Sequence, residues 1–202
     1  MKKFTKVISK AIPLPIKDVD TDQIIPAQFL TSISSDGYGK NLFKRLKEES
    51  PDFPMNQPRY VGAKILIADH NFGCGSSREH AVWALMGAGI EVMIGKSFAD
   101  IFTGNSANNG FLLVTLPSDT VDALLKAAAE TDLELTIDLD SQEVRTSDNQ
   151  IFKFDYDPFR KHCLINGLDD IDYILSEKAS IDSYRTAQAD RRFFSTVAND
   201  QN

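Results

Sequence analysis

The stretch Asn71-Phe72-Gly73-Cys74-Gly75-Ser76-Ser77-Arg78-Glu79-His80 joins two segments with regular hydrophobic patterns. Before it, Lys64–Ala68 is a short apolar run of the kind found in buried β-strands. After it, Ser77–Ala88 has the length and residue types of a helix. Glycines at positions 73 and 75 allow the chain to turn sharply between the two elements. A strand, a glycine-containing turn and a helix in this order are typical of an α/β domain.

The polar residues of this stretch favour an anion. Ser76 and Glu79 have the spacing of a capping box, which predicts Ser76 as the N-cap of the helix. The N-terminus of a helix presents unpaired N–H groups and a partial positive charge. Arg78, in the predicted first turn, adds a planar guanidinium that matches a carboxylate. From these residues alone, an anion site and an ordinary helix start with an exposed arginine both stay open.

Strand and helix signals alternate through much of the chain. We predict strands at Ile90–Ile94, Phe111–Leu116, Leu133–Leu139, Val144 and Ile151–Phe154, and helices at Asn41–Glu49, Phe98–Asn105, Ser118–Glu130 and Asp169–Lys178. Ser118 is the predicted N-cap of its helix. The pattern indicates an α/β fold with a mixed sheet flanked by helices. We expect a single domain over residues 1–180 and a polar tail, residues 181–202, that is partly disordered.

Composition excludes several classes of function. The chain has 202 residues and a formal net charge of −7, and an acidic chain repels phosphate backbones, so we expect no nucleic-acid partner. The uncharged and mainly apolar stretch Ala81–Ile90 is far shorter than the roughly 20 apolar residues of a membrane-spanning helix. The N-terminus lacks the apolar run of a signal peptide. We therefore expect a cytoplasmic protein without a membrane partner, in which Cys74 and Cys163 are free thiols.

Two other kinds of site are weaker alternatives. The nucleophile elbow of hydrolases, Gly-x-Ser-x-Gly, is absent because a glycine stands where the serine should be. Ser76 with His80 or His70 nevertheless leaves a catalytic triad conceivable. The two cysteines and three histidines show no Cys-x-x-Cys or His-x-x-x-His spacing, so we expect no metal bound by this chain.

Several motifs in the same order resemble the C-terminal swivelling domain of the aconitase superfamily and, within it, the small subunits of isopropylmalate isomerases. The resemblance extends over about residues 10–175, and five ordered motifs are more specific than any one alone. The motifs are Asp18–Pro26, Gly75–His80, Gly95–Phe102, Asn105–Gly110 and Phe159–Ile171.

This resemblance implies a swivelling β/β/α domain that acts with a separate large subunit carrying a [4Fe–4S] cluster. The chain itself has too few cysteines to hold such a cluster. The implied reaction belongs to leucine biosynthesis and acts on a small dicarboxylate. It dehydrates 2-isopropylmalate to 2-isopropylmaleate and rehydrates that to 3-isopropylmalate.

The resemblance also implies roles for individual residues. Ser76 resembles the catalytic base, an alkoxide that removes a carbon-bound proton. Ser77 and Arg78 resemble binders of the substrate carboxylate. Asp22 resembles an aspartate that supports a histidine across the domain interface, and Cys74 has no implied role.

One departure from aconitase bears on specificity. Aconitase brings an arginine for the third carboxylate of citrate in the segment that corresponds to Pro26–Ser32. Here that segment has no arginine and contains Phe29 and Leu30, which suit an isopropyl group. A related small subunit for 2-methylmalate and citraconate, or for homoaconitate, is the alternative within the superfamily. A lone hydrolase or binding module is the alternative from another class.

Overall fold

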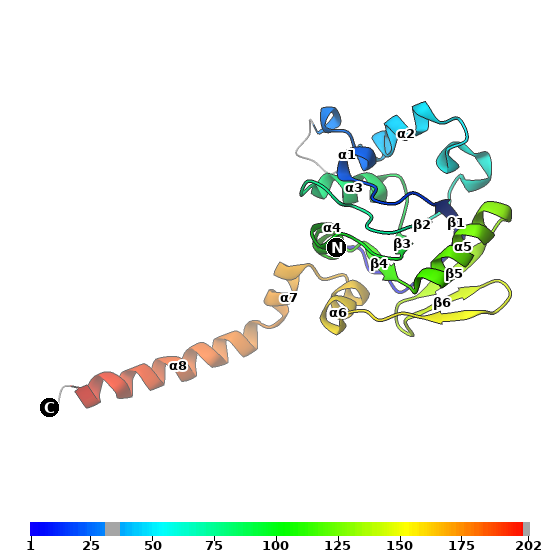
Figure 1. Ribbon diagram of the computed structural model, residues 1–202. Helices are drawn as coiled ribbons and strands as arrows, with labels where there is room; N and C mark the ends of the chain where they lie inside the picture. Colours follow the sequence, from blue (N-terminus) through cyan, green and yellow to red (C-terminus); the bar gives the residue numbers. More distant parts are fainter. Residues whose placement is uncertain (31–36, 200–202) are drawn as a thin grey trace.

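The computed structural model describes residues 1–30 and 37–199, which form a seven-stranded mixed sheet in the order β4-β3-β2-β1-β5-β6-β7 (Figure 1). The predicted strands, which correspond to β2–β7, are present with shifts at their ends, whereas β1 was not predicted. The strands are β1 (Lys6–Leu14), β2 (Ile65–Ala68), β3 (Val92–Gly95), β4 (Leu112–Thr115), β5 (Glu134–Asp138), β6 (Glu143–Thr146) and β7 (Ile151–Lys153).

Strand β1 is shared by a parallel and an antiparallel half of the sheet. It pairs in parallel with β2, which is followed outward by β3 and β4, and it pairs antiparallel with β5 on its other side. Strands β5, β6 and β7 continue as antiparallel neighbours. The carboxyl ends of β1, β2 and β3 therefore meet at one edge of the sheet, which is where ligands bind in open α/β folds.

Eight helices and four 3₁₀ turns surround the sheet in the described part of the chain. The helices are α1 (Thr21–Ile24), α2 (Lys44–Glu49), α3 (Glu79–Gly87), α4 (Asp100–Asn109), α5 (Ser118–Glu130), α6 (Pro158–Asn166), α7 (Asp170–Ser176) and α8 (Lys178–Asn199). The 3₁₀ turns are η1 (Ala27–Phe29), η2 (Tyr38–Asn41), η3 (Pro54–Asn56) and η4 (Pro58–Tyr60).

Each face of the parallel half has its own hydrophobic core. Leu66 and Ala68 of β2 pack with residues of α1, α3 and α4, whereas Ile65 and Ile67 pack with residues of α5 and α6. All four side chains are buried, because successive residues of a strand point to opposite faces and both faces are covered. Burying a side chain of this size contributes roughly 1.5–3 kcal/mol. The predicted α/β class with a mixed, helix-flanked sheet is confirmed.

Two details differ from the sequence prediction. Helix α2 begins at Lys44 rather than at Asn41, because Phe43 has a φ of 50° that a helix does not allow and its ring is fully buried. Helix α5 has the predicted bounds, but Ser118 is its first helical residue and Pro117 is the N-cap. The predicted cap at Ser118 is therefore wrong.

The C-terminal segment forms the long helix α8, which extends away from the domain (Figure 1). Its described side chains, as far as Gln188, are exposed. The helix occupies most of the tail for which the sequence predicts partial disorder, and it begins before the predicted boundary at residue 180. The division into a domain over residues 1–180 and a tail over residues 181–202 stays a prediction. None of the helices in the described ranges has the length and apolar character that crossing a membrane requires.

Candidate functional site

The glycine-rich loop after β2 is bonded through its main chain to the loop after β1. The N–H of Gly73 donates to the carbonyl of Val19 (2.8 Å), and the N–H of Thr21 donates to the carbonyl of Cys74 (3.0 Å). The hydroxyl of Thr21 also donates to the carbonyl of Ser76 (3.2 Å). These bonds hold the part of the loop that precedes Ser77 against helix α1.

The other side of the same loop is bonded to the segment after β3. The N–H of Asn71 donates to Oγ of Ser97 (2.8 Å), and the N–H of Ala99 donates to the carbonyl of Phe72 (3.0 Å). The loop is therefore held between its two neighbours at the carboxyl edge of the sheet. Backbone groups that are fixed in this way can present donors to an anion without further ordering.

A buried ion pair lies where this loop begins. Nζ of Lys96 is 2.8 Å from Oδ1 of Asp69 and 2.6 Å from Oδ1 of Asp122. Burial alone would raise the pKa of Asp69, but the hydrogen bond and the charge of Lys96 outweigh it, so the pKa lies below its ordinary value. The pair ties the end of β2 to the residue after β3.

Gly73 and Gly75 are required by the path of the loop. Their φ angles are 82° and 90°, in the region that favours glycine. A Cβ at Gly73 would also lie 2.3 Å from Cγ of Phe102, which is buried. The predicted sharp turn between strand and helix is therefore present.

The predicted capping box is wrong. Helix α3 begins at Glu79, its N-cap is Arg78 with a φ of −130°, and no side chain caps it. The carboxylate of Glu79 instead accepts a hydrogen bond from Nδ2 of Asn109 (2.7 Å). Ser76 and Ser77 therefore lie exposed in the loop before the helix, and the bond from α1 to the Ser76 carbonyl holds them outside its first turn.

Arg78 is paired with Asp22. Nη1 of Arg78 donates to Oδ1 of Asp22, and the side chains are 17% and 49% exposed, respectively. The hydrogen bond from Arg78 holds the pKa of Asp22 below its ordinary value. Asp22 is placed by helix α1, which has a capping box between Asp20 and Gln23. Sequence reasoning missed this pairing, although the Asp-x-x-Gln spacing carries the signal of a helix start.

Phe29 and Leu30 follow Asp22 closely in the sequence, and both side chains are half-buried. The N–H of Ala27, the first residue of η1, donates to Oδ1 of Asp22 (3.3 Å). Both Phe29 and Leu30 pack against the core on this face of the sheet. The last residues of the predicted specificity segment, positions 31 and 32, lie outside the described residues.

The side chains needed for a hydrolase triad are not brought together. In residues 1–30 and 37–199, neither Ser76 nor Ser77 makes a side-chain hydrogen bond to a histidine. The ring of His80 instead packs edge-on against Tyr38 and Trp83, with centroid distances of 5.2 and 4.8 Å. Among the described residues, no histidine is therefore bonded to either serine to activate it as a nucleophile.

The described residues do not fit an iron–sulfur cluster. No group of three or more His, Cys, Asp or Glu side chains that could hold a metal ion occurs among them. Cys163 is buried on α6, whereas Cys74 lies in the loop after β2, where burial raises the pKa of its thiol. Both cysteines are free thiols, as predicted.

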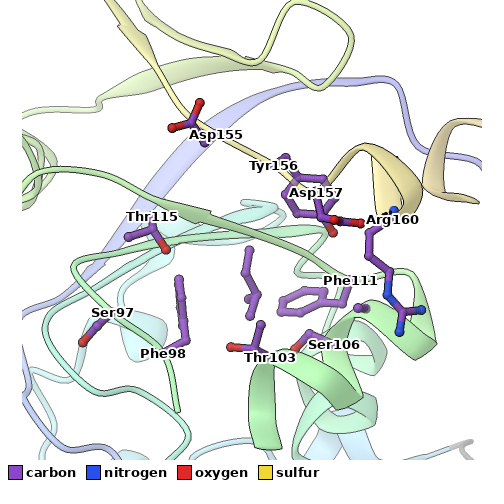
Figure 2. Close-up of a pocket in the computed structure, with 12 residues that line it drawn as sticks. Ser97, Phe98, Thr103, Ser106, Phe111, Thr115, Asp155, Tyr156, Asp157 and Arg160 are labelled. Atoms are coloured by element: carbon purple, nitrogen blue, oxygen red, sulfur yellow. Dashed lines mark hydrogen bonds between the residues drawn. The ribbon is translucent and has the colours of Figure 1, made fainter. Parts of the chain in front are cut away.

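A cavity of about 380 Å³ lies elsewhere, between helix α4, strand β4 and the segment before α6 (Figure 2). Phe98, Phe111 and Tyr156 form much of its wall, and burial raises the pKa of Tyr156 to about 12. None of the predicted site residues lines it. The candidate site is thus an open surface at the sheet edge rather than this cavity.

Known proteins resemble this chain in sequence and in fold. Residues 1–119 match the model of the aconitase C-terminal domain family, and residues 122–158 match a second model, described as LeuD_N. A protein of Francisella tularensis subsp. novicida (strain U112), named 3-isopropylmalate dehydratase small subunit, is 53% identical over 188 residues, which are 93% of this chain and 99% of that protein. The chain belongs to the 3-isopropylmalate dehydratase small-subunit family. The predicted family resemblance is confirmed.

Further members agree with this assignment. A protein of the same name from Ruegeria pomeroyi is 48% identical over 198 residues, 95% of this chain and 98% of that protein. A crystal structure of 3-isopropylmalate dehydratase from Methanocaldococcus jannaschii superimposes with a TM-score of 0.65 at 27% identity, covering 89% of this chain and 99% of that chain. The family fold therefore confirms the predicted swivelling domain of the aconitase C-terminal type.

Proposed function

We propose that this chain is the small subunit of an isopropylmalate isomerase, a hydro-lyase that is active only with its large subunit. The enzyme interconverts 2-isopropylmalate and 3-isopropylmalate through 2-isopropylmaleate. The observation that carries the proposal is the loop of Ser76, Ser77 and Arg78, fixed at the carboxyl edge of the sheet in a member of this family. Close relatives over nearly the whole chain are named for isopropylmalate, which disfavours 2-methylmalate, citraconate and homoaconitate.

Ser76 is the catalytic base in this proposal. Dehydration breaks a C–H and a C–O bond: the alkoxide of Ser76 takes the proton, and the C–H electron pair becomes the double bond as hydroxide leaves. In rehydration the Ser76 hydroxyl returns the proton to carbon. A serine alkoxide is stabilised only by fixed donors in a site without water. Because Ser76 is exposed in the free chain, the surface that excludes water must come from a partner.

Ser77 and Arg78 bind a substrate carboxylate in this scheme. A guanidinium has five N–H donors, and one of those of Arg78 is used by Asp22. The remaining donors suffice for a carboxylate, which Arg78 can bind with two parallel hydrogen bonds. Asp22 thus orients Arg78 within the chain, in addition to the support of a partner histidine that the family resemblance implies.

Phe29 and Leu30 line the pocket for the isopropyl group. Both are half-buried, so each offers apolar surface to a ligand while being anchored on the core. Burial of an isopropyl group contributes about 0.8 kcal/mol per carbon, whereas an unpaired carboxylate in the same place costs several kcal/mol. Citrate is therefore rejected.

The large subunit carries the [4Fe–4S] cluster in this proposal, since the residues of this chain do not fit one. The complex is cytoplasmic, acts on a small dicarboxylate and needs neither nucleic acid nor a membrane.

Co-expression with the candidate large subunit under anaerobic conditions tests the function. Turnover of isopropylmalate by the complex is measured beside turnover of 2-methylmalate and citrate. We expect isopropylmalate to be preferred, and the chain alone to be inactive and free of iron. Turnover by the chain alone, or labelling of Ser76 by a serine-directed phosphonate without the partner, would refute the proposal and support a hydrolase.

A further inference from the structure

Asn109, the last residue of helix α4, uses both ends of its amide group to bind helix α3 and also donates to a carbonyl of its own helix. Its Nδ2 donates to Oε1 of Glu79 (2.7 Å) and to the carbonyl of Asn105 (2.9 Å), and its Oδ1 accepts from Nε1 of Trp83 (2.8 Å). A carboxylate only accepts and an indole N–H only donates, so the amide cannot be turned over without losing both contacts. The orientation of Asn109 is thus fixed by chemistry.

These bonds act on the part of α3 that needs support. The helix has no side-chain cap, and its first residue, Glu79, directly follows Arg78. The first N–H groups of any helix lack partners within the helix, so an uncapped first turn opens easily. Asn109, on the neighbouring helix α4, bonds to the start of α3 at two points. These are Glu79 in the first turn and Trp83 in the second.

We propose that Asn109 is a positioning residue, which acts through Glu79 and Trp83 to fix the direction in which Arg78 meets the substrate carboxylate. The inference rests on the proposed function, in which Arg78 binds that carboxylate. Asp22 holds the guanidinium end of Arg78, and Asn109 holds the backbone end through Glu79. Both ends must be fixed for two parallel hydrogen bonds to a carboxylate.

Swapping the amide of Asn109 and the carboxylate of Glu79 between the two positions tests this inference. Asn109→Asp keeps the acceptor for Trp83, loses the donor to the Asn105 carbonyl and sets two carboxylates against each other at Glu79. Adding Glu79→Gln restores the bond in the opposite direction, because the amide of the new side chain donates to the new carboxylate. Asn108→Ala is the matched control, since Asn108 is the preceding residue of α4, is exposed and makes no side-chain hydrogen bond in the described part of the chain.

In the complex with the large subunit, Asn109→Asp is expected to raise KM for isopropylmalate about tenfold to a hundredfold with a smaller change in kcat. The double variant recovers part of this loss, because the bond at position 79 is restored while the bond to the Asn105 carbonyl is not, and Asn108→Ala matches the wild type. A wild-type KM for a folded Asn109→Asp complex, or a double variant no better than the single one, overturns the inference. Inactivity of the wild-type complex refutes the proposed function instead.

Hydrogen exchange of the free chain separates the two conclusions. Exchange at the second-turn amides of α3, which donate to the carbonyls of its first turn, should be faster in Asn109→Asp and return toward the wild-type rate in the double variant. Trp83 is the only tryptophan, so Asn109→Ala should also shift its emission maximum, because the indole N–H loses its acceptor. Unchanged hydrogen exchange in Asn109→Asp refutes the positioning role of Asn109, whether or not the complex is active.

Discussion

Replacement of Arg78 by lysine tests the substrate-binding role of this residue without removing its charge. Lysine has no planar fork, so it cannot make two parallel hydrogen bonds to one carboxylate. In the structure the side chain of Arg78 is 17% exposed and one of its N–H groups is taken by Asp22. Any loss of binding in Arg78→Lys therefore comes from the donors that Asp22 leaves available.

The structure separates the expected effect on stability from that on binding. Because Asp22 is 49% exposed, solvent screens its pair with Arg78, and the substitution should lower the free energy of unfolding by less than about 1 kcal/mol. A hydrogen bond between charged groups contributes about 1.5–3 kcal/mol. Loss of one such bond to the substrate corresponds to a rise in KM of about tenfold to a hundredfold.

The matched control is Arg160→Lys. Arg160 also donates through Nη1 to an aspartate, Asp170 at 2.9 Å, and its side chain is 32% exposed. Urea unfolding of the free chains should show similar small losses for both variants, whereas only Arg78→Lys should raise KM in the complex. If the folded Arg78→Lys complex binds isopropylmalate as well as the wild type does, Arg78 is an ordinary N-cap residue and its assignment is wrong.

Four further predictions concern neighbouring groups. Ser76→Ala should lower kcat at least about 100-fold with little change in KM, since a base acts in the transition state; wild-type turnover in a folded complex would exclude Ser76 as the base. Leu30→Arg should weaken isopropylmalate turnover and raise turnover of citrate, and a soluble complex with unchanged preference would place specificity elsewhere. Lys96→Met should unfold at a lower urea concentration than Lys96→Met combined with Asp69→Asn, because the single variant leaves a buried carboxylate unpaired. The pKa of Asp22 in the folded state lies below its ordinary 3.8, so ionised Asp22 stabilises the fold above pH 3.8 and this stabilisation is lost as the pH falls through the folded-state pKa. Asp22→Asn should therefore be less stable than the wild type at neutral pH and equally stable in acid. Urea unfolding at several pH values measures this difference.

Local periodicity was sufficient where each element buries a continuous face. Helix α5 has the predicted bounds because its buried residues, Val121, Leu124, Leu125 and Ala128, recur at helical spacing. The alternation of buried and exposed residues likewise located β5. Helix α8 escaped prediction because its described side chains are exposed and its composition is polar, which favours the interpretation of a partly disordered tail.

The candidate site shows where such reasoning ends. Ser76 and Glu79 carry the spacing of a capping box, but the bonds that decide their conformation come from Thr21 and Asn109, which are distant in sequence. Competing tertiary contacts of this kind override a local cap that is worth about 1 kcal/mol. The bond between Arg78 and Asp22 spans 56 residues, and the parallel pairing of β1 with β2, with the hydrogen bonds between the loops that follow them, brings the two side chains together.

The exposure of Ser76 and Ser77 gives a physical reason for a two-subunit enzyme. A serine hydroxyl in contact with water keeps its proton, and an alkoxide forms only where fixed donors replace the solvent. The loop that carries both serines is already ordered by its bonds to the loops after β1 and β3. A partner that closes over it therefore has to exclude water but does not have to fold the loop. Under the proposed function, the small subunit supplies geometry and the large subunit supplies a dry environment, so we expect neither chain alone to stabilise the base.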